Sequence, residues 1–203
     1  MNKTSTAYLW FDTEFTSLEL DEARLLQVSA MLTDKDLKRL TPPEEDLNLY
    51  IRLPETEPVS AWVEKHLPDL LKKCRSRTAV PVEEVGEKLT AYVDRWCGTP
   101  TKTIQKRPLM AGNSVYNDWI LARKFFPVFT SRLHYRLLDV SALKVQWLDL
   151  TEGPEFKKDD PKTVKKYFPE ADLRRLRQHD AYYDIIASAA ELAYYRAHIN
   201  FSA

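Results

Sequence analysis

The chain of 203 residues is 44% hydrophobic and 30% charged, a composition typical of a soluble globular protein with a full apolar core. Thirty basic and thirty acidic residues cancel to a formal net charge of zero, whereas proteins that bind long nucleic acid usually carry a basic excess. The four glycines form neither a Rossmann fingerprint nor a P-loop, and no apolar run approaches the roughly 20 residues that cross a bilayer. These features argue against a nucleotide cofactor held in such loops, a membrane partner and long duplex nucleic acid.

The length fits one domain, and neither an internal repeat nor a change of composition marks a second, so we expect a single domain over residues 1–203. The residues from Met1 to Thr6 show no signal-peptide pattern, which makes a cytoplasmic location the expectation. Cys74 and Cys97 form no paired motif and are expected to be reduced and structural.

The first half of the chain predicts three strands followed by two helices. Aromatic and aliphatic runs typical of buried strands occur at 8–11, 25–32 and 47–53. The charged segment 33–46 carries Pro42-Pro43 and indicates a loop, so the three strands are expected to form an antiparallel meander. Helical spacing of apolar residues follows over 58–71 and 82–96.

The second half predicts strands and helices in alternation. A short strand at 109–111 precedes a helix that Asn113 or Ser114 is expected to cap. The remaining expected elements are a strand at 135–140, a helix from Ser141 and a final helix over 180–197 with Asp180 as its N-cap. The stretch 152–178 is rich in Lys and Arg and has no clear period. The order of elements predicts an α/β fold.

Three acidic positions in the chain are candidates for chemistry. Asp12 and Glu14 lie two residues apart in a strand-like run, so both side chains face the same side. Their apolar flanks place them close to buried structure, where carboxylates are costly unless they are paired or bound to metal. Asp118 lies in the first turn of a predicted helix, where the helix dipole favours a carboxylate. Taken singly, Asp12 and Glu14 also fit a solvated strand end. The favourable interaction with the helix dipole could by itself explain Asp118.

His179 and Asp184 form the last part of the pattern. They are five residues apart, so on one continuous helix they would point about 140° apart. They converge only if His179 precedes the helix and Asp184 lies within its first turns. Hard divalent cations bind oxygen ligands, and two such ions can stabilise both the attacking and the leaving oxygen of a phosphodiester displacement. The acids together with a histidine that can serve as base therefore favour a two-metal nuclease.

The pattern Asp12-x-Glu14, Asp118, His179 and Asp184 resembles the DEDDh group of 3′-to-5′ exonucleases. Further segments resemble the oligoribonuclease branch of that group. They are Gly112-Asn113-Ser114-Val115, His134-Tyr135-Arg136-Leu137-Leu138-Asp139-Val140-Ser141 and Glu191-Leu192-Ala193-Tyr194-Tyr195-Arg196. The resemblance covers most of the chain and implies an RNase H-like exonuclease fold, with a central mixed five-stranded sheet flanked by helices.

The resemblance also implies a catalytic centre. Asp12, Glu14 and Asp184 would hold one Mg²⁺ or Mn²⁺ ion, Asp12 and Asp118 would serve a second, and His179 would be the general base. The implied reaction is hydrolysis of very short oligonucleotides, preferentially 5′-phosphorylated dinucleotides, to nucleoside 5′-monophosphates. The same chemistry on deoxydinucleotides or single-stranded DNA is one alternative, and a non-catalytic nucleotide-binding dimer is another.

Contacts to the substrate follow from the resemblance as well. Leu18 would wedge between bases, while Trp62 and His66 would pack against the first nucleotide. Arg136 and Ser141 would cap the terminal 5′ phosphate, with Tyr135 reaching in from the second subunit of a homodimer, and Ser114 would be a further substrate contact. The residue pattern alone leaves two other interpretations open: Trp62 fits a core position at helical spacing, and Tyr135 fits an ordinary strand aromatic.

Overall fold

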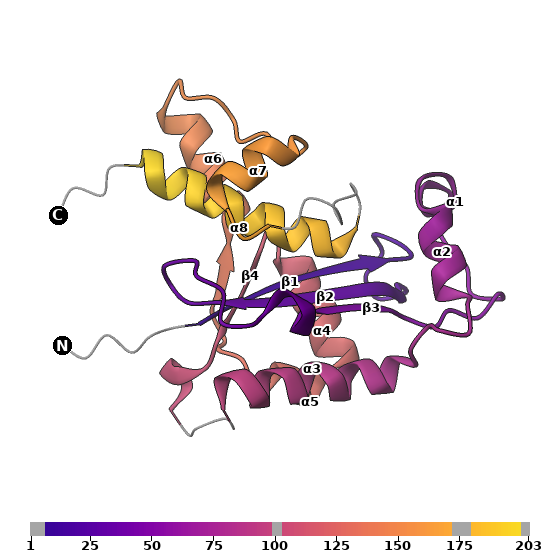
Figure 1. The fold of residues 1–203 in the computed structure, drawn as a ribbon. Helices are drawn as coiled ribbons and strands as arrows, with labels where there is room; N and C mark the ends of the chain where they lie inside the picture. Colours follow the sequence, from indigo (N-terminus) through magenta and orange to yellow (C-terminus); the bar gives the residue numbers. More distant parts are fainter. Residues whose placement is uncertain (1–6, 99–102, 172–179, 200–203) are drawn as a thin grey trace.

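A computed structural model of the protein describes residues 7–98, 103–171 and 180–199, and it places a five-stranded sheet between two layers of helices (Figure 1). The strands are β1 (Tyr8–Phe15), β2 (Leu25–Thr33), β3 (Leu47–Tyr50), β4 (Leu109–Gly112) and β5 (Leu137–Asp139). Their order across the sheet is β3-β2-β1-β4-β5. The first three strands are antiparallel, whereas β4 runs parallel to β1 and β5 parallel to β4. The predicted mixed five-stranded sheet and the antiparallel meander are confirmed.

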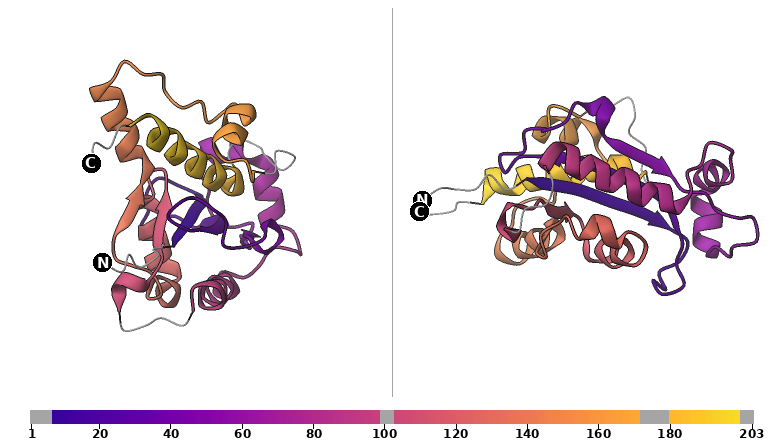
Figure 2. Two further views of the ribbon diagram at one scale, coloured as in Figure 1. Left: turned by 60° about the vertical axis from the view of Figure 1, so that its left-hand side comes forward. Right: turned by 90° about the horizontal axis from the view of Figure 1, so that it is seen from below.

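The alternation of side chains along β1 explains why the sheet is covered on both faces. Leu9 and Phe11 point into a core formed with α3, α4 and α5, whereas Trp10 points into a second core formed with α8. The two further views separate these layers (Figure 2). The helices are α1 (Ala61–His66), α2 (Pro68–Cys74), α3 (Val82–Cys97), α4 (Tyr116–Phe125), α5 (Pro127–Thr130), α6 (Val140–Leu150), α7 (Pro161–Tyr167) and α8 (Ala181–His198).

The helix predicted over 58–71 is two short helices, α1 and α2. The break falls at Leu67, whose φ of −121° and ψ of 39° lie outside the helical region. Pro68 follows it, and a proline disfavours helical geometry at the preceding residue. Ser60 caps α1 by accepting a hydrogen bond from the Val63 amide, so α1 begins three residues after the predicted start at Pro58.

The predicted cap of α4 is wrong. Val115 occupies the N-cap position, and neither Asn113 nor Ser114 makes a side-chain hydrogen bond there. Ser114 instead adopts a positive φ of 49°, and its amide donates to the side chains of Asp139, at the end of β5, and Ser141, just after it. The predicted cap of α8 is confirmed, because the Asp180 carboxylate accepts a hydrogen bond from the Tyr182 amide.

Several expected boundaries differ from the observed ones, and β3 ends at Tyr50 rather than at the predicted residue 53. β1 extends beyond the predicted 8–11 to Phe15, so both candidate acids of this segment lie within the strand. β5 spans only three residues, and α6 begins at Val140 with the Asp139 carboxylate as its cap. The segment 33–46 contains a 3₁₀ turn at Pro43–Glu45, and a second such turn lies at Ile104–Lys106. No helix within the described ranges is long and apolar enough to cross a bilayer.

β4 and β1 approach each other closely where the strands lead into the candidate site. A Cβ atom added at Gly112 would lie 3.0 Å from the backbone oxygen of Phe11. Such a contact would be tighter than nearly all Cβ contacts in proteins, so glycine at this position permits β4 to approach the backbone of Phe11, the residue before Asp12.

Candidate active site

Three carboxylates converge where the end of β1 meets the start of α8. Asp12 and Glu14 lie two residues apart in β1 and face the same side of the sheet as Trp10, toward α8. Asp184 lies in the first turn of α8. One carboxylate oxygen from each of these three side chains lies within 4.8 Å of the others. The structure therefore brings together three of the four acids that the sequence analysis singled out as one group.

The fourth acid, Asp118, is held beside this group by Thr13. The hydroxyl of Thr13 donates to Asp118 Oδ1 at 2.6 Å, and the Thr13 amide donates to the same oxygen at 2.8 Å. Both residues are buried, with 4% of Thr13 and 5% of Asp118 exposed. The sequence analysis missed Thr13, although its position between Asp12 and Glu14 on the opposite face of β1 was the available signal.

Burial and mutual repulsion make the carboxylates costly to ionise. Burial raises the pKa of Asp12 well above its ordinary value, and the charges of Asp118, Asp184 and Glu14 raise it further. The pKa of Glu14 rises to about 8, mainly through burial and then through Asp184. Burial also raises the pKa of Asp118 to about 7, although the hydrogen bonds from Thr13 oppose the shift.

This donor set suits a hard divalent cation. Carboxylate oxygens are the ligands that Mg²⁺ and Mn²⁺ prefer. Several acids held together without cations of matching charge repel one another, and a bound divalent cation would remove that repulsion. Asp12, Glu14, Asp118 and Asp184 thus fit the ions that the sequence analysis expected.

A lysine that the sequence analysis did not single out also reaches the cluster. Lys158 lies between α6 and α7, and its Nζ atom is 3.4 Å from Asp184 Oδ1. Burial opposes the charged form of Lys158, but the Asp184 carboxylate prevails and raises the pKa of the lysine. The sequence could not indicate this contact, because the stretch 152–178 has no period from which to place its side chains.

His179, the expected general base, lies outside the described residues, and its role stays a prediction. The start of α8 is compatible with that role. Asp180 is the N-cap of α8 and Asp184 lies in its first turn, as the sequence analysis expected of this helix.

Two of the residues expected to contact the substrate, Ser114 and Ser141, follow the parallel strands β4 and β5. The carboxyl ends of parallel strands meet at one edge of a sheet, which here is also the edge of Asp12 and Glu14. The amide of Ser114 donates to Ser141 Oγ at 2.9 Å and to Asp139 Oδ1 at 3.0 Å. The structure therefore brings Ser114 and Ser141 together at this edge.

Tyr135 and Arg136 precede β5. Tyr135 is 64% exposed and stacks on His134 with ring centroids 4.6 Å apart. The guanidinium carbon of Arg136 lies 5.6 Å from the centre of the Tyr135 ring. Because β5 begins at Leu137, the interpretation of Tyr135 as an ordinary strand aromatic is wrong.

The expected base-stacking residues lie on segments that follow β1 and β3. Leu18 is 83% exposed in the connection from β1 to β2, and Trp62 on α1 is 49% exposed. The ring of Trp62 stacks on that of His66, with the ring centroids 4.7 Å apart. Because Trp62 is half exposed, its interpretation as a core residue is wrong. The amide of Ser60 donates to the Thr16 carbonyl at 2.9 Å and thereby fixes the start of α1 beside the end of β1.

Two polar networks that the sequence analysis missed hold α8 in place. In the first, Asn113 donates to Glu191 Oε2 at 2.7 Å, and the Tyr195 hydroxyl donates to Glu191 Oε1 at 2.9 Å. These contacts join α8 to the end of β4, where Ser141 Oγ also contacts the Asn113 side chain. Glu191 and Tyr195 lie in the C-terminal segment that carried part of the family resemblance, which was the available signal.

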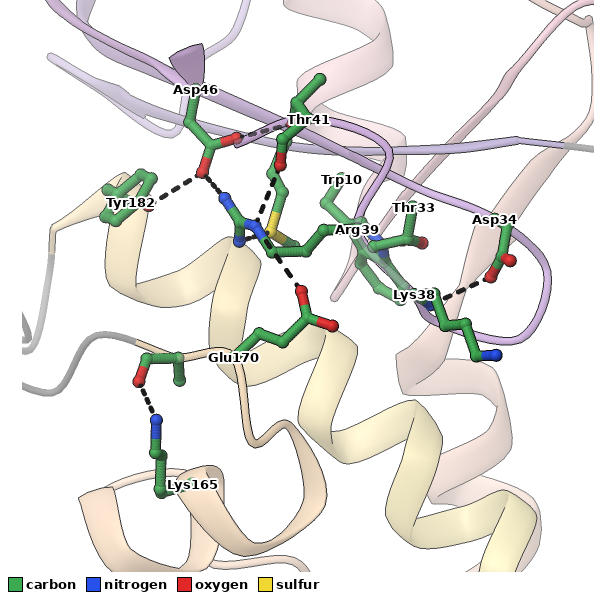
Figure 3. A network of polar contacts seen from close by, with 12 residues as sticks. Trp10, Thr33, Asp34, Lys38, Arg39, Thr41, Asp46, Lys165, Glu170 and Tyr182 are labelled. Atoms are coloured by element: carbon green, nitrogen blue, oxygen red, sulfur yellow. Dashed lines mark hydrogen bonds and ion pairs between the residues drawn. The ribbon is translucent and has the colours of Figure 1, made fainter. Parts of the chain in front are cut away.

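The second network fixes the first turn of α8 (Figure 3). Arg39 forms a buried ion pair with Asp46, and Thr41 Oγ1 donates to the same carboxylate at 3.0 Å. The hydroxyl of Tyr182 donates to Asp46 Oδ2 at 2.8 Å. Because Tyr182 lies two residues before Asp184, this network links the loop after β2 to the helix turn that carries a candidate metal ligand.

Comparison with known proteins shows which family this chain resembles in sequence. A family profile described as "Exonuclease" matches residues 9–192. The oligoribonuclease of Tropheryma whipplei is 30% identical over 96% of this chain and 94% of its own length. A probable oligoribonuclease of Drosophila melanogaster is 29% identical over 96% of this chain and 82% of its own length. A human mitochondrial oligoribonuclease is 27% identical over 94% and 72%, respectively.

Solved structures of exonucleases share the fold. Zinc-bound exonuclease I of E. coli in complex with single-stranded DNA superposes with a TM-score of 0.64 at 12% identity, and it covers 96% of this chain. Cell-death related nuclease 4 gives the same TM-score of 0.64 at 13% identity and again covers 96% of this chain. The chain spans 41% of the exonuclease I chain and 65% of the nuclease 4 chain. At these identities the likeness concerns the fold, and it confirms the predicted RNase H-like exonuclease architecture.

Proposed function

The chain belongs to the exonuclease family, on its oligoribonuclease branch, and from this premise we propose that it degrades very short oligonucleotides from the 3′ end. The preferred substrates would be 5′-phosphorylated dinucleotides, and the products nucleoside 5′-monophosphates. The observation that carries this proposal is the approach of the Asp12, Glu14 and Asp184 oxygens to within 4.8 Å of one another. Asp118, oriented by Thr13 next to this group, completes the set of acids.

The metal-holding residues follow from this cluster. Asp12, Glu14 and Asp184 would hold one Mg²⁺ or Mn²⁺ ion, and Asp12 with Asp118 would hold a second. When bound, such ions supply Lewis-acid stabilisation of the attacking and leaving oxygens of the phosphodiester. Thr13 would keep Asp118 oriented through its two hydrogen bonds, and His179 would accept a proton from the attacking water.

The substrate ends would be held by the segments around the cluster. Arg136, Ser114 and Ser141 would bind the 5′ phosphate, because a guanidinium and donors at the end of a sheet suit a phosphate. The position of Ser114 and Ser141 at the carboxyl edge of β4 and β5 supports their assignment, whereas Arg136 precedes β5 and its assignment rests on the family resemblance. The exposed side chains of Leu18 and Trp62, on the segments that follow β1 and β3, would contact the bases.

Tyr135 would complete the site from a second subunit. Its ring is largely exposed in the single chain, and the neighbouring Arg136 and His134 hold it at the start of β5. In a homodimer, this exposed ring would reach the active site of the second subunit. The formal net charge of zero supports a short substrate, because a long phosphate backbone would meet few compensating cations.

The test is a product time course on 5′-labelled, 5′-phosphorylated RNA and DNA oligomers, from dinucleotides to pentamers, with added Mg²⁺ or Mn²⁺. We expect RNA to shorten stepwise from the 3′ end with release of 5′-monophosphates. Asp184→Asn should abolish the reaction, while Asp69→Asn on α2 serves as the matched control. Faster shortening of the DNA pentamer would assign the deoxyribonuclease alternative. Nucleotide binding without hydrolysis by the parent chain in either metal would favour the non-catalytic dimer and refute the enzyme.

A further inference from the structure

Lys158 is the cation that the described structure places against the carboxylate cluster. Its Nζ atom lies 3.4 Å from Asp184 Oδ1, with half of the lysine side chain and about a fifth of the Asp184 side chain exposed. A pair at this depth is screened less than one on an open surface. The ammonium therefore contributes positive charge at the point where negative charges converge.

The backbone of Lys158 is held in place by its surroundings. The Tyr183 hydroxyl donates to the Lys158 carbonyl, and the Lys158 amide donates to the Phe156 carbonyl at 3.2 Å. The buried ring of Phe156 packs against Tyr167 and Tyr194. Tyr183 precedes Asp184 in α8, so one helix turn holds both the backbone of the lysine and the carboxylate that it pairs with.

We propose that Lys158 is a resident counter-charge of the carboxylate cluster, which pairs with Asp184 in the metal-free protein and competes with divalent cations for that carboxylate. This inference rests on the proposed metal site. The lysine stabilises the cluster before a cation binds, and the same positive charge weakens cation binding afterwards. Lys158 is thus a positioning residue that sets the affinity of the site for metal.

The two effects of removing the charge have opposite signs. In Lys158→Met the apolar stem is retained and the ammonium is lost, so the metal-free protein should have a lower Tm. A divalent cation would no longer be repelled by the lysine, and at distances of a few ångströms in a partly solvated site this tightens binding by about three- to tenfold. A lysine with only a structural role would not produce tighter metal binding on removal.

The experiment is calorimetric titration of chelator-treated, full-length protein with Mn²⁺, together with thermal melts in EDTA. Lys158→Met is compared with Lys158→Arg, which keeps the charge, and with Lys157→Met, an exposed neighbour in the same segment. We expect about three- to tenfold tighter Mn²⁺ binding only in Lys158→Met, with the gain shrinking at high salt. Lys158→Gln makes the same comparison if the methionine variant does not fold.

The outcomes separate this inference from the proposed function. If the parent binds Mn²⁺ but Lys158→Met and Lys158→Gln bind it equally well or more weakly, the counter-charge assignment is overturned and the metal site stands. If the parent binds no Mn²⁺ at all, the metal site itself is overturned, and with it the competition inferred here.

Discussion

Glu14→Gln should stabilise the metal-free protein at neutral and alkaline pH. Burial, with the charge of Asp184, raises the pKa of Glu14 from 4.5 to about 8. The folded protein therefore retains a proton that the unfolded chain releases, so the stability contributed by Glu14 is complete below pH 4.5 and is lost as the pH rises toward 8. Linkage over this interval, discounted for the solvent that still reaches the side chain, gives a cost of about 1–3 kcal/mol at pH 7. Glutamine carries no charge and avoids this cost.

Urea unfolding in EDTA at pH 5, 7 and 9 measures the effect. The free energy of unfolding of the parent should fall between pH 5 and 9, and Glu14→Gln should show a smaller fall and exceed the parent at pH 7 and 9. Glu87→Gln, an exposed position on α3, is the matched control and should follow the parent. Excess Mg²⁺ should reverse the ranking, because the parent alone retains the full set of ligands and gains stability by binding. A Glu14→Gln variant that is less stable than the parent at pH 9 in EDTA would refute the reasoning.

The other predictions concern the residue that orients Asp118, the expected general base, a tyrosine that anchors α8 and the arginine expected at the 5′ phosphate. Thr13→Val should lose about 1.5–3 kcal/mol in urea unfolding, because a hydroxyl hydrogen bond to a buried carboxylate is removed, and Thr13→Ser should retain most of it. His179→Ala should keep its calorimetric Mn²⁺ affinity yet lose about 10²–10⁴-fold in rate, as loss of a general base does; a rate within a few-fold of the parent would assign the base elsewhere. Tyr182→Phe should lower stability by about 1–2 kcal/mol in thermal melts, since Asp46 loses a buried donor, and an unchanged Tm would show that the network does not anchor α8. Arg136→Ala should reduce the rate advantage of 5′-phosphorylated over 5′-hydroxyl dinucleotides in steady-state kinetics, and an unaltered ratio would remove it from the phosphate site.

Local patterns were sufficient for the parts of the site that depend on local geometry. The period of two in a strand places Asp12 and Glu14 on one face, and the structure has them there. The capping preference of aspartate located the start of α8 at Asp180, which in turn placed Asp184 in the first turn. The mixed five-stranded sheet followed from a resemblance in motifs, because pairing of distant strands is not encoded in local periodicity.

Contacts between distant segments could not be predicted in this way. The pairing of Thr13 with Asp118 joins residues 105 positions apart, and that of Lys158 with Asp184 depends on how a segment without periodicity crosses α8. Ser114 departs from its expected capping role, since its hydroxyl lies 3.2 Å from Ser141 Oγ and caps no amide of α4. Helix propensity alone could not show these choices, because tertiary hydrogen bonds decide them.

Substrate length tests the central claim most directly. If Arg136, Ser114 and Ser141 close the site at a 5′ phosphate, a longer chain must give up that contact to reach the carboxylates. The measurement is kcat/KM on 5′-phosphorylated RNA from two to seven nucleotides, at fixed Mg²⁺ and ionic strength. The account predicts the highest value for the dinucleotide and a steep decline with each added nucleotide. Equal values for the two-mer and the seven-mer would contradict a closed site and indicate a general single-strand exonuclease.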